Sequence, residues 1–202
     1  IKNSIHLLSR HVGNDGAPIY DILKKETDRV ARVVRQMLGL YRANDRPVAF
    51  DVNQVIEDTL TLFARQIERG GITVSTDFGK IPPVVGSSDQ MRQVISNLVV
   101  NAKDSMSASG GKLILRTRHI RPGDRSHGSV RITIADSGSG IPPTLRATMF
   151  EPFVSSKGEK GTGLGLWIVK GIIENHGGRI AVRSKEGVGT VFQIEVPVVR
   201  SL

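Results

Sequence analysis

The spacing of apolar residues divides the chain into a short helical region and a longer mixed region. Over residues 1–46, apolar side chains recur at alternating steps of three and four, as in helices that pack side by side. Turn residues at 13–18 interrupt the pattern, so two helices are expected. The stripe on the second helix consists of Ile19, Leu23, Val30, Val33, Met37 and Leu40. Two such helices bury little surface alone, so we expect a four-helix bundle with a second copy of the chain; the alternative is a helical pair packed on its own domain.

After Pro47 the pattern changes to alternating strands and helices. Runs of β-branched residues with a period of two predict strands at 49–52, 72–78, 111–119, 129–135, 179–184 and 189–197. Helical periodicity predicts helices at 53–69, 88–106 and 163–176. Strands that follow one another directly favour hairpins, so the expected fold class is α+β, a two-layer α/β sandwich with one sheet covered by helices on one face. The expected domains are therefore a helical hairpin at 1–46 and a mixed domain at 47–202.

Composition narrows the classes of function. None of the 202 residues is cysteine, which excludes disulfides, cysteine-ligated metals and thiol catalysis, and suits the cytoplasm. The net charge of +9 divides into +4 over residues 1–46 and +5 over 47–202 without any block of like charge. Only 4% of residues are aromatic, so nucleic-acid binding is not expected. No apolar run is long enough to span a bilayer, so no membrane contact is expected either.

Three short polar residues form a stripe on the helix expected at 88–106. Asn97, Asn101 and Asp104 lie within about 60° of one another, outside the arc of apolar residues. Asparagine is a mediocre helix former, so two of them four residues apart need an explanation. One explanation is Mg²⁺, because this cation favours oxygen donors such as an amide oxygen. The alternative is a solvated helix face.

A carboxylate ends the strand expected at 129–135. Asp136 is followed by Ser137-Gly138-Ser139-Gly140, in which the glycines leave room for close approach of a ligand. A carboxylate in that position can accept hydrogen bonds from the amine of a flat heterocycle. Asp-x-Gly-x-Gly is also a common turn composition, so an ordinary turn is the alternative.

A glycine-rich segment opens the helix expected at 163–176. Its sequence is Gly161-Thr162-Gly163-Leu164-Gly165-Leu166. Free N–H groups at such a helix N-terminus can cradle phosphate, and a flexible surface loop is the alternative. Upstream, Phe150 and Phe153 are expected either to anchor a cover formed by residues 154–161 or to be ordinary core residues.

Four segments of the chain resemble, in order, four motifs of the catalytic domain of sensor histidine kinases. The segment with Asn97 and Asn101 resembles the N box, residues 136–140 the first G box, residues 150–153 the F box and residues 161–166 the second G box. That domain is one branch of an ATPase superfamily shared with DNA gyrase, the heat-shock chaperone ATPase and mismatch-repair ATPases. The resemblance covers about residues 47–197. Residues 1–46 resemble part of the family's dimerisation and histidine-phosphotransfer domain. The acidic Asp104, where many members carry Lys or Arg, is similar to the nitrogen-regulation-type branch.

The resemblance implies a binding site for ATP or ADP with Mg²⁺. Asn101 would ligate the metal, Asn97 would lie beside the γ-phosphate, and Asp136 would bind the adenine amine. The remaining residues implied in nucleotide binding are Gly138, Gly140, Lys157, Gly161, Thr162, Gly163, Leu164, Gly165, Leu166 and Thr190. Gly138 and Gly140 would admit the base, Thr190 would support Asp136, and Lys157 would replace the cation missing at Asp104.

The implied activity is transfer of the γ-phosphoryl group to a histidine and then to an Asp of a response-regulator receiver domain. The implied assembly is a homodimer through residues 1–46 in a bacterial cytoplasm. Neither His6 nor His11 fits the family's acceptor pattern, so the acceptor histidine is expected before Ile1, where the uncapped chain would begin inside a helix. One alternative is a clamp ATPase, a branch that places Glu where Asn97 stands. Another is a nucleotide-binding dimer scaffold without kinase activity.

Overall fold

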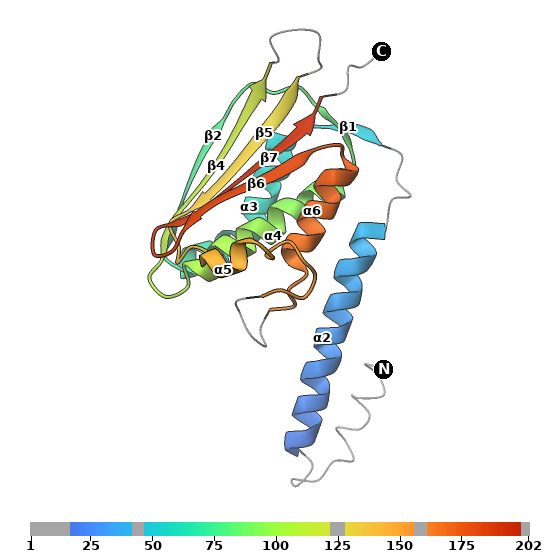
Figure 1. Ribbon diagram of the computed structural model, residues 1–202, viewed down its shortest axis with the longest axis vertical. Helices are drawn as coiled ribbons and strands as arrows, with labels where there is room; N and C mark the ends of the chain where they lie inside the picture. Colours follow the sequence, from blue (N-terminus) through green and yellow to red (C-terminus); the bar gives the residue numbers. More distant parts are fainter. Residues whose placement is uncertain (1–16, 42–46, 122–127, 156–160, 199–202) are drawn as a thin grey trace.

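The computed structural model describes residues 17–41, 47–121, 128–155 and 161–198 (Figure 1). The helices are α2 (Ala17–Tyr41), α3 (Val52–Arg69), α4 (Ser88–Ser105), α5 (Pro143–Arg146) and α6 (Gly165–Asn175). The strands are β1 (Val48–Phe50), β2 (Ile72–Phe78), β3 (Val84–Gly86), β4 (Gly111–Ile120), β5 (Ser129–Asp136), β6 (Arg179–Lys185) and β7 (Gly189–Pro197). None of the helices in these ranges is long and apolar enough to cross a membrane.

Five strands form the main sheet, in the order β2-β4-β5-β7-β6. Strands β4 and β5 pair antiparallel, as do β6 and β7, which confirms both predicted hairpins. Strand β2 pairs parallel to β4, and its connection runs through β3 and α4. Figure 1 shows α3, α4 and α6 on one side of this sheet, so the predicted two-layer sandwich is confirmed.

A second, two-stranded sheet was not predicted. It pairs β1 antiparallel with β3 and brings Phe50 opposite Val84. Strand β3 is only three residues long and follows Pro82 and Pro83, so it lacks the alternation by which a strand is recognised. The strand expected at 49–52 consequently belongs to this small sheet and not to the main one.

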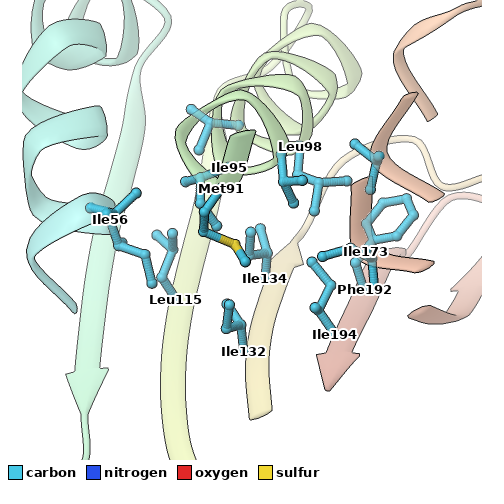
Figure 2. Packing of buried hydrophobic residues seen from close by; sticks show 14 of the residues in the cluster. Ile56, Met91, Ile95, Leu98, Leu115, Ile132, Ile134, Ile173, Phe192 and Ile194 are labelled. Atoms are coloured by element: carbon cyan, nitrogen blue, oxygen red, sulfur yellow. The ribbon is translucent and has the colours of Figure 1, made fainter. Parts of the chain in front are cut away.

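The core lies between the main sheet and the helices. Met91, Ile95 and Leu98 of α4 are almost completely buried, and Figure 2 shows them packed above strand residues that include Leu115 and Ile134. Burial of each such side chain contributes roughly 1.5–3 kcal/mol, so this contact holds α4 against the sheet. The polar stripe of α4 is thereby fixed in direction, because apolar and polar residues share one rigid helix.

Side-chain caps define where the two central helices begin. The Asp51 carboxylate accepts a hydrogen bond from the Asn53 amide at 2.8 Å, and the Ser87 hydroxyl accepts one from the Gln90 amide at 3.3 Å. Each cap satisfies one of the amides that have no partner inside the helix. Helices α3 and α4 therefore start within one residue of the predicted positions.

Helix α2 confirms the second of the two helices expected in residues 1–46, whereas the first lies outside the described residues. Some residues of the apolar stripe on α2 are exposed, whereas another packs against the mixed domain. Ile19, Leu23 and Val30 are 67%, 46% and 59% exposed, whereas Val33 packs against the core of the mixed domain. Contacts with α4 and α6 explain this, so Val33 does not belong to a free bundle-forming face as expected.

Candidate functional site

A cavity of about 460 Å³ opens beside α4, at the ends of β5 and β7. Its polar wall comes from α4, from the end of β5 and from the start of α6. The residues that line it are Asn97, Val100, Asn101, Asp104, Ser105, Asp136, Ser139, Gly140, Ile141, Leu145, Met149, Val154, Ser155, Gly161, Thr162, Gly163, Gly165, Leu166, Thr190 and Phe192. Segments up to 95 residues apart in the sequence thus meet in one cavity, large enough for a small organic molecule.

The polar stripe of α4 faces this cavity, as Asn97, Asn101 and Asp104 all line it. The side-chain amide nitrogen of Asn97 donates a hydrogen bond to the carbonyl oxygen of Gly165 at 3.3 Å. This bond joins α4 to the first residue of α6, so Asn97 connects two walls of the cavity. Asn97 is therefore tied to a neighbouring helix, and the stripe as a whole borders the cavity.

Asp136 ends β5 and projects into the same cavity. Its Oδ1 atom accepts a hydrogen bond from the Gly138 amide at 2.9 Å and lies 3.2 Å from the hydroxyl of Ser105. The same hydroxyl is 2.8 Å from the carbonyl oxygen of Ala102. Because a serine hydroxyl has a single proton, these two acceptors share it. Both donors act on Oδ1, which fixes the orientation of the carboxyl group.

The environment of Asp136 changes its acidity. Burial raises the pKa of Asp136 above its ordinary value, because a carboxylate loses hydration in the cavity wall. Hydrogen bonds from Gly138, Ser105 and the backbone of Thr190 act in the opposite direction and offset only part of this effect. A partly desolvated carboxyl group in a cavity is a candidate for a functional role.

Glycine is required at positions 138 and 140, after Asp136, for different structural reasons. Gly140 lines the cavity at a φ of +72°, and a Cβ atom there would lie 2.3 Å from the carbonyl oxygen of Lys185. Gly138 is buried and does not line the cavity, and its Cβ would lie 2.1 Å from the Ser105 hydroxyl oxygen. Gly138 therefore makes room for Ser105, whereas Gly140 permits the tight turn at the cavity edge.

The glycine-rich segment supplies the opposite wall. Gly161, Thr162, Gly163, Gly165 and Leu166 line the cavity, whereas Leu164 is completely buried and belongs to the core. Lys157, the expected cation, lies outside the described residues. The segment from Gly161 onward therefore faces the cavity as predicted.

Helix α6 starts in this wall without a side-chain cap. The first backbone bond of the helix runs from the amide of Ile168 to the carbonyl oxygen of Leu164 at 2.9 Å. Amides that precede the first helical bond have no partner inside a helix. The start of α6 therefore turns its amide end, which is also the positive end of the helix dipole, toward the cavity.

Of the two phenylalanines upstream, Phe150 agrees with the expectation of a core residue and Phe153 does not. Phe150 packs against the core, but Phe153 is 67% exposed and has a φ of 67°. A Cβ atom added to Gly163 would lie 2.3 Å from the Phe153 backbone. Phe153 therefore lies against Gly163 through its main chain, and its exposed ring does not anchor the segment.

Thr190 is 4% exposed and lies directly opposite Asp136 in the ladder between β5 and β7. Its hydroxyl lies 3.0 Å from that of Ser184 on β6. The Ser184 hydroxyl also accepts from the amide of Ile141 at 2.8 Å and donates to the carbonyl oxygen of Gly189 at 3.0 Å. Ser184 therefore joins Thr190 to the turn after Asp136.

Sequence reasoning missed Ser105 and Ser184. Ser105 continues the four-residue spacing of Asn97 and Asn101, so helical periodicity was a usable signal. Ser184 carried no signal, because a single serine in a strand is unremarkable and its partners come from other strands. The apolar wall formed by Ile141, Leu145 and Met149 was also missed, since those residues lie in a loop-rich stretch.

Comparison with known proteins identifies the class to which this fold and cavity belong. Residues 86–200 match the family described as histidine kinase-, DNA gyrase B-, and HSP90-like ATPase. The match covers more than half of the chain, and the chain belongs to this family.

Curated relatives narrow the class to the sensor histidine kinases. Sensor kinase CckA of Brucella abortus (strain 2308) is 37% identical over 98% of this chain and 22% of its own length. Sensory histidine kinase/phosphatase NtrB of Escherichia coli O157:H7 is 32% identical over 98% of this chain and 57% of its own length. The chain thus spans between about a fifth and three fifths of the relatives' lengths.

Solved structures agree with this class. Full-length ShkA in complex with AMPPNP superposes with a TM-score of 0.73 at 25% identity, over 94% of this chain and 40% of that chain. The catalytic domain of histidine kinase ThkA superposes with a TM-score of 0.63 at 31% identity, over 76% of this chain and 96% of that chain. The two-layer fold is therefore that of a histidine kinase catalytic domain.

Proposed function

We propose that the cavity binds ATP with Mg²⁺ and presents its γ-phosphoryl group to a histidine. The observation that carries this proposal is the convergence of Asn101, Asp136 and the uncapped start of α6 on one cavity. A metal-ligand amide, an acceptor for adenine and a phosphate-binding helix start are the three parts that Mg-ATP requires. The family, and the AMPPNP complex of ShkA, support a nucleotide as the ligand.

The adenine end of the nucleotide belongs at Asp136. Because Gly138 and Ser105 both act on Oδ1, we assign Oδ2 to the exocyclic amine of adenine. Guanine has a carbonyl oxygen at the corresponding position, so two hydrogen-bond acceptors, this oxygen and Oδ2 of Asp136, would face each other. We therefore expect ATP to be preferred over GTP by about 1–3 kcal/mol, the usual effect of an unpaired buried polar group.

The donor set fits Mg²⁺ that arrives with the phosphates. Asn97, Asn101 and Asp104 offer only oxygen and amide groups, which suit a hard cation. The described residues contain no group of three or more His, Cys, Asp or Glu side chains that could hold a metal by themselves. Asn101 would hold the ion together with phosphate oxygens, and the ion would neutralise charge on those oxygens.

Transfer requires a second element. The acceptor nitrogen of a histidine on the dimerisation helix would attack the γ-phosphorus, the bond to the bridging oxygen would break, and ADP would leave. Positioning and charge neutralisation are the main contributions of such a site. Asn97 cannot act as a base toward water, because its amide donates to Gly165 and carries no basic group. This favours histidine phosphorylation over a clamp ATPase.

We further propose that the longer protein acts as a homodimer through residues 1–46. A receiver-domain Asp would then accept the phosphoryl group from the histidine. Residues 47–202 would form the ATP-binding domain, and a separate helix would carry the acceptor histidine. The expected cytoplasmic location is compatible with ATP as the substrate.

Titration calorimetry tests the nucleotide site. Wild-type protein should bind ATP more tightly with Mg²⁺ than without it, and Asn101→Ala should remove this difference. Asp136→Asn should remove the preference for ATP over GTP, because its amide nitrogen would take the place of Oδ2. Equal affinities for ATP and GTP in the wild type would contradict the role of Asp136. Acid-labile labelling of the full-length protein by γ-labelled ATP tests the transfer step, and its absence would leave a nucleotide-binding scaffold.

A further inference from the structure

The face of the main sheet that points away from the helices concentrates positive charge. Side chains alternate along each strand, so the neighbours of the buried residues on β4 and β7 project to this outer face. Its cations are Lys112, Arg116, Arg118, Arg131, Arg179, Arg183 and Lys185, and its acids are Asp77 and Glu195. Seven cations and two anions give this outer face a net charge of +5.

The helical side has no such excess. Helix α3 carries two basic and three acidic residues, and α4 and α6 are each neutral. Figure 1 shows these helices on one side of the sheet only, and no helix of the described residues lies on the outer face. The outer face and these three helices therefore differ by about six charges, which is a strong asymmetry for a small domain.

Ion pairs hold part of this charge in fixed positions. Glu195 is bound by Arg131 at 2.6 Å and by Arg179 at 2.5 Å, and Asp77 is bound by Arg118 at 2.6 Å. Arg116 lies 3.6 Å from the same Asp77 carboxylate. Each acid thus bridges two arginines, so each group of three keeps one net positive charge. A guanidinium has five N–H donors, so donors remain for a ligand.

A row of aliphatic side chains crosses the middle of this face. Ile114, Ala135 and Val191 stand next to one another in the register of β4, β5 and β7, and all three are partly exposed. Arg183 follows on β6, directly opposite Val191. The outer face is therefore an apolar centre bordered by cations.

We infer that this outer face docks a separate protein whose surface presents carboxylates around a few aliphatic side chains. Permanent interfaces are largely apolar, whereas this face has a single apolar row within a charged surround, which suits reversible association. No outer-face residue of the five strands is aromatic, so bases have nothing to stack on and a membrane interface would find no aromatic side chain to anchor. The inference does not depend on the proposed nucleotide site.

Nuclear magnetic resonance titration tests the inference with defined probes. The probe is a short peptide in which glutamates flank two leucines, and the comparison probes are its lysine counterpart, a short DNA duplex and phosphatidylserine vesicles. We expect amide shifts at Ile114, Val191 and Arg183 with the acidic peptide alone, weakening as salt is added. Absence of shifts on the outer face, or equal binding of DNA or vesicles, would overturn the inference.

Matched variants locate the interaction. Arg116→Gln with Arg183→Gln removes two charges from the outer face and should weaken peptide binding by about threefold or more. Arg65→Gln with Lys170→Gln removes two exposed charges from the helical side and should leave the affinity unchanged. Unchanged melting temperature and ATP affinity in both double variants would show that the fold and the nucleotide site are intact. Equal losses in the two double variants would contradict a docking face.

Discussion

The side chain of Asn97 donates to the carbonyl oxygen of Gly165 at 3.3 Å, and this contact joins the middle of α4 to the first residue of α6. The two residues are 68 positions apart in the chain. Helix α4 is fixed on the sheet by its buried apolar face, so the bond places the start of α6 relative to a rigid support. Asn97 thereby shapes the cavity before any ligand is bound.

Replacing Asn97 tests this contact in the ligand-free protein. Asn97→Ala removes one hydrogen bond and should lower the free energy of unfolding by about 1 kcal/mol. Asn97→Asp should lower it further, by about 1–3 kcal/mol, because a carboxylate would face the Gly165 carbonyl without a donor. Urea denaturation measures both values. An Asn97→Asp protein as stable as the wild type would show that the contact does not hold α6.

Gly163 should be the least replaceable glycine of the segment before α6. Its φ is +66°, and an added Cβ would lie 2.3 Å from the Phe153 backbone, so Gly163→Ala combines a strained backbone with a clash. Gly187 has a similar φ of +73° with no atom near its Cβ position, and Gly187→Ala isolates the strain alone, about 1–2 kcal/mol. We expect Gly163→Ala to lose more unfolding free energy than Gly187→Ala in denaturant titrations.

Gly165→Ala provides the complementary control. The nearest atom to its Cβ position is 3.9 Å away, on Asn97, and the residue is helical, so stability should be unchanged or slightly higher. If Gly163→Ala were as stable to unfolding as Gly165→Ala, the close contact between the Phe153 backbone and Gly163 would be contradicted.

The charge of Asp136 should lower the stability of the nucleotide-free protein at neutral pH. Its raised pKa means that the folded state binds the proton more tightly than the unfolded state. This group's contribution to stability therefore falls as pH rises from the pKa of the unfolded state through that of the folded state. Asp136→Asn keeps an oxygen for the Gly138 amide and removes the desolvated charge. Without nucleotide, Asp136→Asn should melt at the same or a higher temperature than the wild type at pH 7, with the difference shrinking as pH is lowered.

Asp77 offers a control of opposite sign. Hydrogen bonding by Arg118 lowers the pKa of Asp77, so this carboxylate stabilises the fold above its unfolded pKa and loses that contribution as pH falls. Asp77→Asn should therefore be no more stable than the wild type at pH 7. Calorimetric melting of both variants between acidic and neutral pH separates the two signs, and a destabilised Asp136→Asn protein at pH 7 would contradict the assignment.

Local sequence patterns predicted most of the fold and part of the site. Helical periodicity and strand alternation are short-range signals, so the starts of α3 and α4 and the boundaries of the main strands agree with the structure. Asn97 and Asn101 were singled out because asparagine is a mediocre helix former, and Asp136 because a carboxylate ends a strand just before two glycines. The roles of Ser105 and Ser184 depend on atoms brought near by other strands, which no local pattern contains.

The charged outer face was missed for the same reason. Its cations are spread over residues 112–185 and alternate with inward-facing residues, so the chain shows no block of like charge. Only the register of the sheet places Arg118, Arg131 and Arg179 across neighbouring strands with Glu195 among them. A dispersed charge in the sequence is thus compatible with a concentrated charge in the fold.

The exposed apolar residues of α2 lead to the final prediction, which concerns dimerisation. Of the nine large hydrophobic residues that are exposed in the described parts of the chain, five lie on α2: Ile19, Ile22, Leu23, Val30 and Val34. Burial of each against a partner helix would contribute roughly 1.5–3 kcal/mol, which favours association through this helix. Val33 is unsuitable as a probe, because it packs on its own domain and a charge there would disturb the monomer.

Leu23→Glu is the informative change. It would bury a charge without a partner at the helix contact, so the dimer should dissociate while the catalytic domain still melts at the wild-type temperature. The matched control is Leu62→Glu on α3, where the leucine is 69% exposed, and it should leave the assembly unchanged. Sedimentation analysis over a range of concentrations measures both. A monomeric wild type, or equal dissociation by Leu62→Glu, would show that α2 does not form the dimer contact.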